Sequence, residues 1–115
     1  MFQLEDFKKV TVIGKISYIN KYQSYVVVIP KAYTPIFYAL APEKPRIFKI
    51  VAYLNGERII IGQRNIYKSS SDNFILLLPK NLQYIWEQNH KKDIILLFEK
   101  VENNSSNIET SLSTE

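Results

Sequence analysis

The chain reads Tyr25-Val26-Val27-Val28-Ile29-Pro30-Lys31 in its first third, and forty-nine residues later it reads Phe74-Ile75-Leu76-Leu77-Leu78-Pro79-Lys80. Both runs consist of an aromatic residue, four aliphatic residues and a Pro-Lys pair. Upstream of them, Val12-Ile13-Gly14 is matched by Ile60-Ile61-Gly62 at a spacing of forty-eight. Internal repetition at a fixed period is the signature of a duplicated structural unit. The sequence therefore predicts two copies of one unit of nearly fifty residues.

Length and composition indicate a single globular domain. The chain has 115 residues, of which 46% are hydrophobic, and this is enough to bury one modest core. No apolar run approaches the roughly eighteen residues that a membrane-spanning helix needs. The first residues also lack the basic-then-apolar layout of a signal peptide, so we expect an intracellular, cytoplasmic protein. The absence of cysteine excludes disulfides and thiolate metal sites.

Charge is unevenly distributed along the chain. The sequence contains 15 basic and 11 acidic residues, and three of the acids, with none of the bases, lie after Val101. Residues 1–101 therefore hold fifteen bases and eight acids, a net charge of +7. A basic domain of this size suits a polyanionic partner such as a nucleic acid. Solubility alone is the alternative explanation.

The first copy, about 9–54, reads as strand, strand, helix and strand. The expected elements are strands over about Lys9–Ile19, Tyr25–Ile29 and Arg46–Leu54 and a helix over Pro35–Ala41 with Ile36, Phe37 and Leu40 inward. Gly14 predicts a bulge or a bend inside the first strand. The second strand has no polar residue and is expected to be buried on both faces. Thr34 is the expected N-cap of the helix, because Pro35 suits the first helical position.

The second copy, about 58–101, repeats this plan. It follows an Asn55-Gly56 pair, which suits the positive φ angles of a type I′ hairpin turn. The expected elements are strands over Arg58–Lys68, Phe74–Leu78 and Asp93–Val101 and a helix from about Asn81, its N-cap, to Asn89. Residues 102–115 are rich in Asn, Ser, Thr and Glu, which predicts a disordered polar tail.

Neither copy is large enough to bury a continuous core alone, so the two copies must complete one core together. Six strands that close with pseudo-twofold symmetry, with two short helices over the ends, form the simplest arrangement that leaves no strand edge exposed. The predicted fold is therefore mainly β. It is a small six-stranded barrel made of two strand–strand–helix–strand repeats, in one domain over residues 1–101.

A resemblance to a known family lies in Val28-Ile29-Pro30-Lys31 and Leu77-Leu78-Pro79-Lys80, each followed by a short helix and a strand. These runs resemble the core motif of the AbrB/SpoVT-type DNA-binding domains, which belong to the cradle-loop barrels. In that family two chains supply the two units by swapping hairpins, whereas here one chain contains both over about 9–101. The resemblance therefore implies a single-chain pseudodimer. The Gly-Asp pair that follows the helix in the family is represented here by Asp93 alone.

By this resemblance, DNA is bound by basic residues of the first strand of each unit and of the turn that follows it. The matching positions are Lys15 and Lys21 in the first copy and Arg64 and Lys68 in the second. Cations on two symmetry-related loops can straddle a groove and reach phosphates, and Arg64 can also read a guanine edge. The alternative is that all four are ordinary solvated strand and turn residues.

Lys31 and Lys80 follow the strand-ending prolines and have two competing interpretations. They can contact phosphates beside the same surface, as the resemblance allows. They can also simply prevent the strand from extending, while their charged ends reach water. The sequence leaves both interpretations open.

No constellation of residues predicts catalysis, a metal site or a cofactor. The single histidine, His90, lies in a polar run at the expected end of the second helix and is interpreted as a solvated side chain. No Ser or Thr has the context of a catalytic triad, and no acids stand at metal-ligand spacing. Trp86 aligns with Phe37 across the repeat, which predicts a core residue. We therefore expect a protein that is not an enzyme.

The sequence is best explained by a DNA-binding transcription regulator that acts as a single-chain pseudodimer on duplex DNA. Because the copies have diverged, we expect an asymmetric or weakly specific site. The alternatives are a protein-interaction module, such as an antitoxin whose tail at 102–115 binds a partner, and a structural protein of a virus or mobile element. Association into a homodimer stays open, since Tyr33, Tyr38 and Tyr84 suit either an association surface or simple packing.

Overall fold

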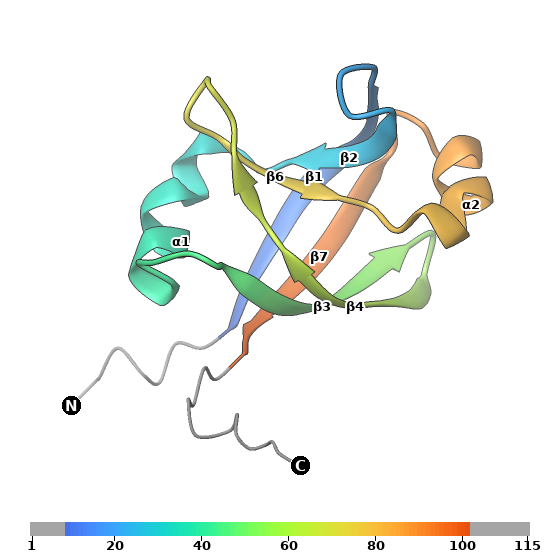
Figure 1. Cartoon of the computed structure of the whole chain (residues 1–115). Helices are drawn as coiled ribbons and strands as arrows, with labels where there is room; N and C mark the ends of the chain where they lie inside the picture. The colour runs from blue at the N-terminus through green and yellow to red at the C-terminus, as the bar shows by residue number, and fades with distance from the viewer. Residues whose placement is uncertain (1–8, 102–115) are drawn as a thin grey trace, which may run out of the picture.

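The computed structural model of the chain describes residues 9–101, so the predicted tail at 102–115 lies outside the described residues. Within 9–101 the chain forms one antiparallel sheet in the order β4-β3-β7-β1-β2-β6-β5, curled into a half-barrel. Two short helices stand at opposite ends of this sheet (Figure 1). The elements are β1 Lys9–Ile19, β2 Ser24–Val28, α1 Thr34–Leu40, β3 Ile47–Leu54, β4 Glu57–Asn65, β5 Tyr67–Lys68, β6 Phe74–Leu77, α2 Gln83–Gln88 and β7 Asp93–Lys100, with 3-10 turns at Lys31–Tyr33 and Lys80–Leu82. The fold is mainly β with two short helices, as predicted.

The sheet has seven strands rather than six because the strand predicted over Arg58–Lys68 is divided into two. The first part, β4, pairs with β3, and the second part, β5, pairs with β6. Between them, Ile66 is buried in the core, and its N–H donates to the carbonyl of Arg46 at 3.0 Å. Ile66 therefore connects β4, which pairs with β3, to β5, which pairs with β6. β4 and β5 are the two ends of the strand order.

β1 changes partner midway along its length. Residues 9–15 pair with β7, and residues 16–19 pair with β2. Gly14 lies just before the change, and a Cβ atom there would come within 2.6 Å of the Val27 side chain. Glycine therefore permits a close approach of β1 to β2 where the sheet bends. The register with β7 runs through Gly14 without a bulge, and the bulge lies instead in β4 beside Gly62, whose φ is +93°.

One hydrophobic core fills the curled sheet, and Phe37 of α1 is fully buried in it. The ring of Phe37 contacts the rings of Phe48, Phe74 and Phe98 at centroid distances of 5.3, 5.9 and 5.0 Å. These three rings come from β3, β6 and β7, so a single side chain joins distant parts of the sheet. Trp86 of α2 is also fully buried, which confirms the prediction of a core residue.

The two helices begin differently from the prediction. Thr34 is the first residue of α1 rather than its N-cap, and its hydroxyl donates to the carbonyl of Asp72 at 3.2 Å. Asn81 lies inside the 3-10 turn before α2 and makes no capping hydrogen bond. In both cases the 3-10 turn itself supplies the acceptor, the carbonyl of Lys31 or Lys80, for the first helical N–H. A side-chain cap is therefore not needed at that donor.

Burial departs from the predicted pattern at two apolar positions. Ile36 is exposed, although it was expected to face inward, because α1 is only seven residues long and buries one narrow stripe, Phe37 and Leu40. Val28 is also exposed, in the strand predicted to be buried on both faces. It pairs with Ile75 of β6, and both side chains lie outside the main core cluster. The outer face of β2 is therefore partly open.

The hairpin between β3 and β4 confirms the predicted turn. Asn55 and Gly56 have φ angles of +54° and +80°, as a type I′ turn requires. The Asn55 side chain donates to the side chain of Asn89 at 2.9 Å, and Asn89 in turn donates to the carbonyl of Ile85 at 2.8 Å. The hairpin is thus fastened to the end of α2.

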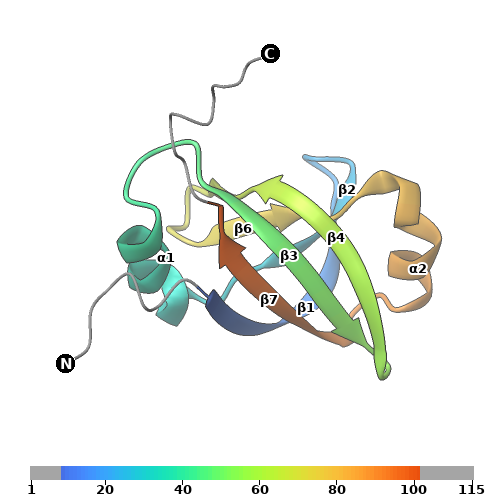
Figure 2. The ribbon, with the colours of Figure 1, turned by 90° about the horizontal axis from the view of Figure 1, so that it is seen from below.

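The curled sheet presents two outer sides. β2 and β6, with the second half of β1 and with β5, form what we call the β2–β6 side. β4, β3, β7 and the first half of β1 form the β3–β7 side. Figure 2 shows the strands of the β3–β7 side lying next to one another, with α1 and α2 beyond its two ends.

Candidate nucleic-acid interface

Two polar turns flank the β2–β6 side. One comprises residues 20–23, between β1 and β2, and the other residues 69–73, between β5 and β6; both project beyond the β2–β6 pair in Figure 1. The strands are joined at both ends by equivalent hydrogen bonds, from the N–H of Ile29 to the carbonyl of Phe74 at 2.8 Å and from the N–H of Leu78 to the carbonyl of Tyr25 at 2.9 Å. This pairing holds the two turns at a set separation.

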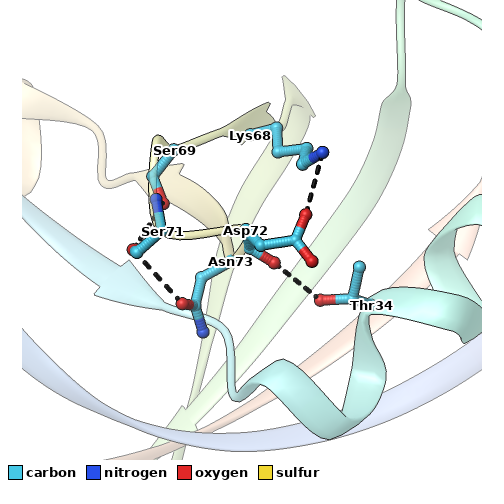
Figure 3. Close-up of polar contacts among 6 residues, drawn as sticks. All are labelled: Thr34, Lys68, Ser69, Ser71, Asp72 and Asn73. Carbon is cyan, nitrogen blue, oxygen red and sulfur yellow. Dashed lines mark hydrogen bonds and ion pairs between the residues drawn. The ribbon is translucent and has the colours of Figure 1, made fainter.

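The turn at residues 69–73 is shaped by hydrogen bonds within it. The N–H of Ser69 donates to the carbonyl of Asn73 at 2.8 Å, and the N–H of Asp72 donates to the carbonyl of Ser69 at 3.1 Å. The hydroxyl of Ser71 lies within hydrogen-bond distance of the side chains of Ser69 and Asn73 (Figure 3). Asp72 has a φ of +71°, a conformation that Asp adopts more readily than most residues. The turn is therefore ordered by its own polar side chains.

The same turn is anchored to the segment between β2 and α1. The hydroxyl of the buried Thr34 donates to the carbonyl of Asp72 (Figure 3). The side-chain amide of Asn73 donates to the carbonyl of Ile29 at 3.0 Å. These two bonds join residues about forty positions apart in the sequence. The turn after β5 therefore lies against the start of α1, close to Lys31.

Lys68 and Asp72 form an ion pair in this turn, with 2.8 Å between Nζ and Oδ1 (Figure 3). The hydrogen bond from Lys68 holds the pKa of Asp72 below its ordinary value, and the positive charge of Lys31 adds to the effect. The same bond raises the pKa of Lys68, whose Nζ also lies 5.6 Å from the ring centroid of Tyr38. Both charged groups are exposed, so an incoming phosphate can compete with Asp72 for Lys68.

Two more of the predicted DNA-binding lysines lie on the first half of the chain. Lys15 projects from β1, where its Nζ pairs with Oδ1 of Asp93 at 2.8 Å. Lys21 is exposed in the turn at residues 20–23, with its Nζ 5.6 Å from the ring centroid of Tyr22. Lys21 forms no ion pair with any carboxylate among residues 9–101. Of these two lysines, Lys21 has the charge that is more readily available to a ligand.

Arg64 lies in a different environment from the four lysines of the turns and Pro-Lys runs. It is half-buried, and its partner in the β3–β4 register is the core residue Phe48. Paired residues share a face of the sheet, so the Arg64 side chain leaves the inner face rather than the outer one. Counted from Gly14 and Gly62, the position that matches Lys15 is Gln63.

Lys31 and Lys80 begin the two 3-10 turns that follow β2 and β6, and both are exposed. In each turn the preceding proline carbonyl accepts a backbone hydrogen bond, from Tyr33 to Pro30 at 2.9 Å and from Leu82 to Pro79 at 3.2 Å. The chain therefore turns away from the sheet immediately after each strand. Both lysines stand where β2 and β6 end, beside the β2–β6 side.

Residues 15–33 and 64–82 include the β2–β6 side and its turns, together with the last residue of β1 that pairs with β7 and the end of β4. Together they contain six basic residues and one acid, Asp72, which is already paired with Lys68. The other acids of the described chain lie elsewhere: Glu43, Glu57, Glu87, Asp93 and Glu99. All six predicted DNA-binding residues belong to these two segments, although Arg64 faces inward and Lys15 is paired.

Arg46 was not singled out by the sequence, and it is the most buried cation among the described residues, at 8% exposure. Its Nε and Nη2 donate to the carbonyls of Ala41 and Pro42 at 2.8 and 3.0 Å, at the end of α1. Its guanidinium also lies 5.0 Å from the ring centroid of Tyr38 and 5.4 Å from that of Phe74. A cation at a helix C-terminus is favoured by the helix dipole. Nothing in the local sequence distinguishes it from the neighbouring solvated lysines.

A pocket of about 500 Å³ lies beside Arg46, at the edge of the β2–β6 side. It is lined by Lys44, Pro45, Arg46, Asn65, Ile66, Tyr67 and Lys68. The lining therefore contains three cations and no acid. It extends the positive surface from the turn at residues 69–73 toward the connection after α1.

The described residues offer few other groups for chemistry. No set of three or more His, Cys, Asp or Glu side chains within 9–101 is placed to hold a metal ion. Neither α1 nor α2 is long and apolar enough to cross a membrane. His90 is exposed after α2, with its ring 5.9 Å from that of Tyr25.

Comparison with known proteins finds no relative of this chain. No family model matches it, and no curated protein or solved structure matches it significantly. The resemblance to AbrB/SpoVT-type domains therefore rests on the two Pro-Lys runs and on the short helix and strand after each of them. Function has to be argued from charge and geometry.

Proposed function

We propose that this protein is a DNA-binding transcription regulator of the AbrB-like type, which holds duplex DNA against the β2–β6 side and its two turns. The observation that carries the proposal is the charge of this side. Four exposed lysines, Lys21, Lys31, Lys68 and Lys80, and a single acid, Asp72, lie on this side and its turns, a net charge of +3 out of the +7 found over residues 1–101. Contact with a phosphate backbone depends on such a surface of one sign.

We also infer that the two halves of the chain are copies of one unit, closed into a barrel with pseudo-twofold symmetry. In support, β1 pairs with β7 and then with β2, and residues 57–68 pair in the same way with β3 and then with β6. β2 pairs with β6, and β3 pairs with β7. Exchanging the two halves leaves this pairing pattern unchanged. The ends of the strand order, β4 and β5, are consecutive in the chain and joined through Ile66, which supports the proposed closure.

A pseudodimer of this kind suits duplex DNA, whose recognition by twofold-symmetric proteins places equivalent elements on equivalent backbone positions. The two turns are not equal, however. At the repeat spacing of forty-nine, Lys21 is matched by Ser70, and the turn at residues 69–73 carries the Lys68–Asp72 pair instead. We therefore propose an asymmetric or weakly specific DNA site rather than a strict palindrome.

The proposal is tested by fluorescence anisotropy with a random-sequence DNA duplex at two salt concentrations. We expect micromolar binding that weakens on the order of 100-fold between about 50 and 200 mM salt, as contact with about four phosphates implies. The double variant Lys21→Ala with Lys80→Ala should reduce the salt slope by about two, because each phosphate-bound lysine contributes about one.

A matched control removes two lysines from the other side of the molecule. Lys9→Ala with Lys49→Ala changes the net charge equally but touches the first half of β1 and β3. We expect it to leave the salt slope nearly unchanged. Equal losses in the two double variants, or no binding by the unaltered protein at low salt, would remove the β2–β6 side from consideration as a DNA-binding surface.

A protein-interaction module is the second candidate, and the exposed apolar side chains of the β3–β7 side favour it. In an antitoxin-like version of this function, the tail at 102–115 would bind the partner. Truncation after Val101 separates the two sources of binding, because it removes the tail and leaves the β3–β7 side intact. Loss of a co-purifying partner on truncation would favour the tail.

A further inference from the structure

The outward positions at the centre of the β3–β7 side are occupied by apolar residues in two neighbouring rows. The strand registers align the first row as Tyr53, Ile95 and Ile13 and the second as Ile60, Val51, Leu97 and Thr11. The residues that alternate with them along the strands are buried: Val12, Ile50, Ala52 and Leu96. Because successive side chains in a strand point to opposite faces, both rows point to solvent. We call Ile13, Val51, Tyr53, Ile60, Ile95 and Leu97 the apolar patch.

The apolar patch is well exposed and continuous. Ile60 is 64% exposed, Ile13 56%, Ile95 40% and Tyr53 38%, while Val51 and Leu97 lie between them and are half-buried. Neighbouring rows are separated by about 7 Å along a strand and neighbouring strands by about 4.8 Å, so these side chains adjoin one another. Single exposed apolar residues are common, but a contiguous group in the middle of a sheet marks an interaction surface.

Charged rows border the apolar patch on both margins. On one margin the registers align Lys49, Glu99 and Lys9 across β3, β7 and β1. On the other margin, Lys15 and Asp93 form an ion pair across β1 and β7. Arg58 of β4, which pairs with Tyr53, lies at the end of the first apolar row. An apolar centre within a polar rim is the usual anatomy of a protein–protein interface. The rim is of mixed charge, and each of its acids, Glu99 and Asp93, is next to a lysine.

We propose that the apolar patch binds a second copy of this chain, forming a symmetric homodimer through the β3–β7 side. Consider a twofold axis that runs parallel to the strands and lies between β3 and β7. It places β3 of one copy opposite β7 of the second copy. Lys49 then faces Glu99 of the second copy, and Tyr53 faces Ile95 of the second copy. An axis across the strands would instead bring Glu99 toward Asp93 of the second copy, which like charges disfavour.

The size of the surface sets the expected strength of the dimer. Four strands and four rows outline about 500 Å², whereas a standard stable interface buries about 800 Å² of accessible surface per partner. Protruding side chains such as Ile60 raise the accessible area above the outline. We therefore expect a weak dimer with a dissociation constant on the order of micromolar. The two β2–β6 sides of the dimer would face outward at its opposite ends. The dimer is therefore expected to form whether or not the protein binds DNA.

Sedimentation equilibrium of the full chain across a concentration series tests the proposal. The unaltered protein should pass from monomer to dimer, and Ile95→Lys should stay monomeric, because it places two charges in the apolar centre. Ile36→Lys is the matched control, since Ile36 is an exposed apolar residue of α1 outside the patch. It should dimerise as the unaltered protein does. Circular dichroism and urea unfolding of each variant show that it is folded.

A charge-reversal experiment tests the arrangement of the two copies. Lys49→Glu and Glu99→Lys should each weaken self-association about tenfold or more, because each places like charges opposite one another across the axis. An equimolar mixture of the two variants should regain association as a heterodimer, in which every facing pair has opposite charges. This recovery does not follow from the pairing of opposite charges at positions 49 and 99 within one chain, because each variant has like charges at these two positions.

Three results would overturn the proposal. One is a monomer at roughly 200 µM unaltered protein, a concentration well above the expected dissociation constant. Another is a dimer that Ile95→Lys leaves intact. The third is a mixture of Lys49→Glu and Glu99→Lys that associates no better than either variant alone.

Discussion

On the β2–β6 side, two polar turns and four exposed lysines surround a pair of strands whose own side chains are mostly apolar. On the β3–β7 side, the strands carry two apolar rows between rows of mixed charge. Both sides use antiparallel ladders and enclose the same core. The difference lies in the turns and in the outward positions, where no core contact constrains the residue. The partner that we propose for each side follows from those positions.

The strongest effect should come from the residue that joins the two sides. Phe37→Ala removes a ring that contacts β3, β6 and β7, and we expect a loss of about 3–5 kcal/mol in the free energy of unfolding. Urea unfolding measures the loss, and both DNA binding and self-association should fail together near the midpoint. Ile36→Ala, at the exposed neighbour, should stay within about 0.5 kcal/mol. A cost near 1 kcal/mol for Phe37→Ala would mean that this ring does not hold the two sides together.

Gly14, where β1 passes from one side to the other, should come next. Gly14→Ala places a Cβ 2.6 Å from the Val27 side chain, and overpacking of this kind costs about 1–3 kcal/mol. In a double-mutant cycle, Val27→Ala should recover part of that cost. Gly62→Ala provides the contrast, because its φ of +93° creates strain while no atom lies within 4 Å. Its cost should show no coupling to Val27→Ala, and coupling there would contradict this distinction.

Thr34→Val should affect the β2–β6 side selectively. It removes the donor from the buried Thr34 to the turn at residues 69–73 and leaves the Asp72 carbonyl without this partner, which costs about 1–2 kcal/mol. Hydrogen exchange of the N–H of Asp72 should accelerate, while exchange in β3 and β7 should change little. Thr11→Val, at an exposed position on the other side, is the control and should keep stability within about 0.5 kcal/mol. Uniform acceleration of exchange would show that the turn is not a separate unit.

Asp72→Asn should sharpen the contrast in charge between the two sides. The variant removes the one acid of the β2–β6 side and frees Lys68, while Asn tolerates the φ of +71° at this position. We expect duplex DNA to bind about two- to fivefold more tightly, with a slightly steeper salt slope. Self-association should not change. Unaltered or weaker DNA binding would mean that Lys68 is not part of the DNA-binding surface.

The smallest effect should be the pH dependence of the Lys68–Asp72 pair. The pKa of Asp72 is lowered in the folded protein, so the unfolded chain takes up this proton more readily. The pair therefore contributes to stability above the ordinary carboxyl pKa, and the contribution is lost as pH falls through the lowered pKa. Urea midpoints at about pH 3 and pH 5, compared with those of Asp72→Asn, measure it. The contribution should be small because both groups are exposed.

Local chemistry was sufficient for most of the elements and for part of the site. Strand ends followed from Pro30 and Pro79, which cannot continue a ladder, and the hairpin at Asn55-Gly56 followed from its φ requirement. The matching Pro-Lys runs located the two lysines at the ends of β2 and β6. Each of these inferences uses only a residue and its immediate neighbours in the chain.

The sequence by itself determined that the chain is mainly β, where most of its strands and turns lie, and that its first 101 residues are basic. Only the tertiary structure decided that Thr34 bonds to a turn thirty-eight residues away and that Arg64 faces inward. It also decided that Ile13 and Ile95 meet on an outer face. These outcomes depend on strand register and on how the sheet curls. A shift of one residue in register reverses the face of every side chain, so they are properties of long-range pairing.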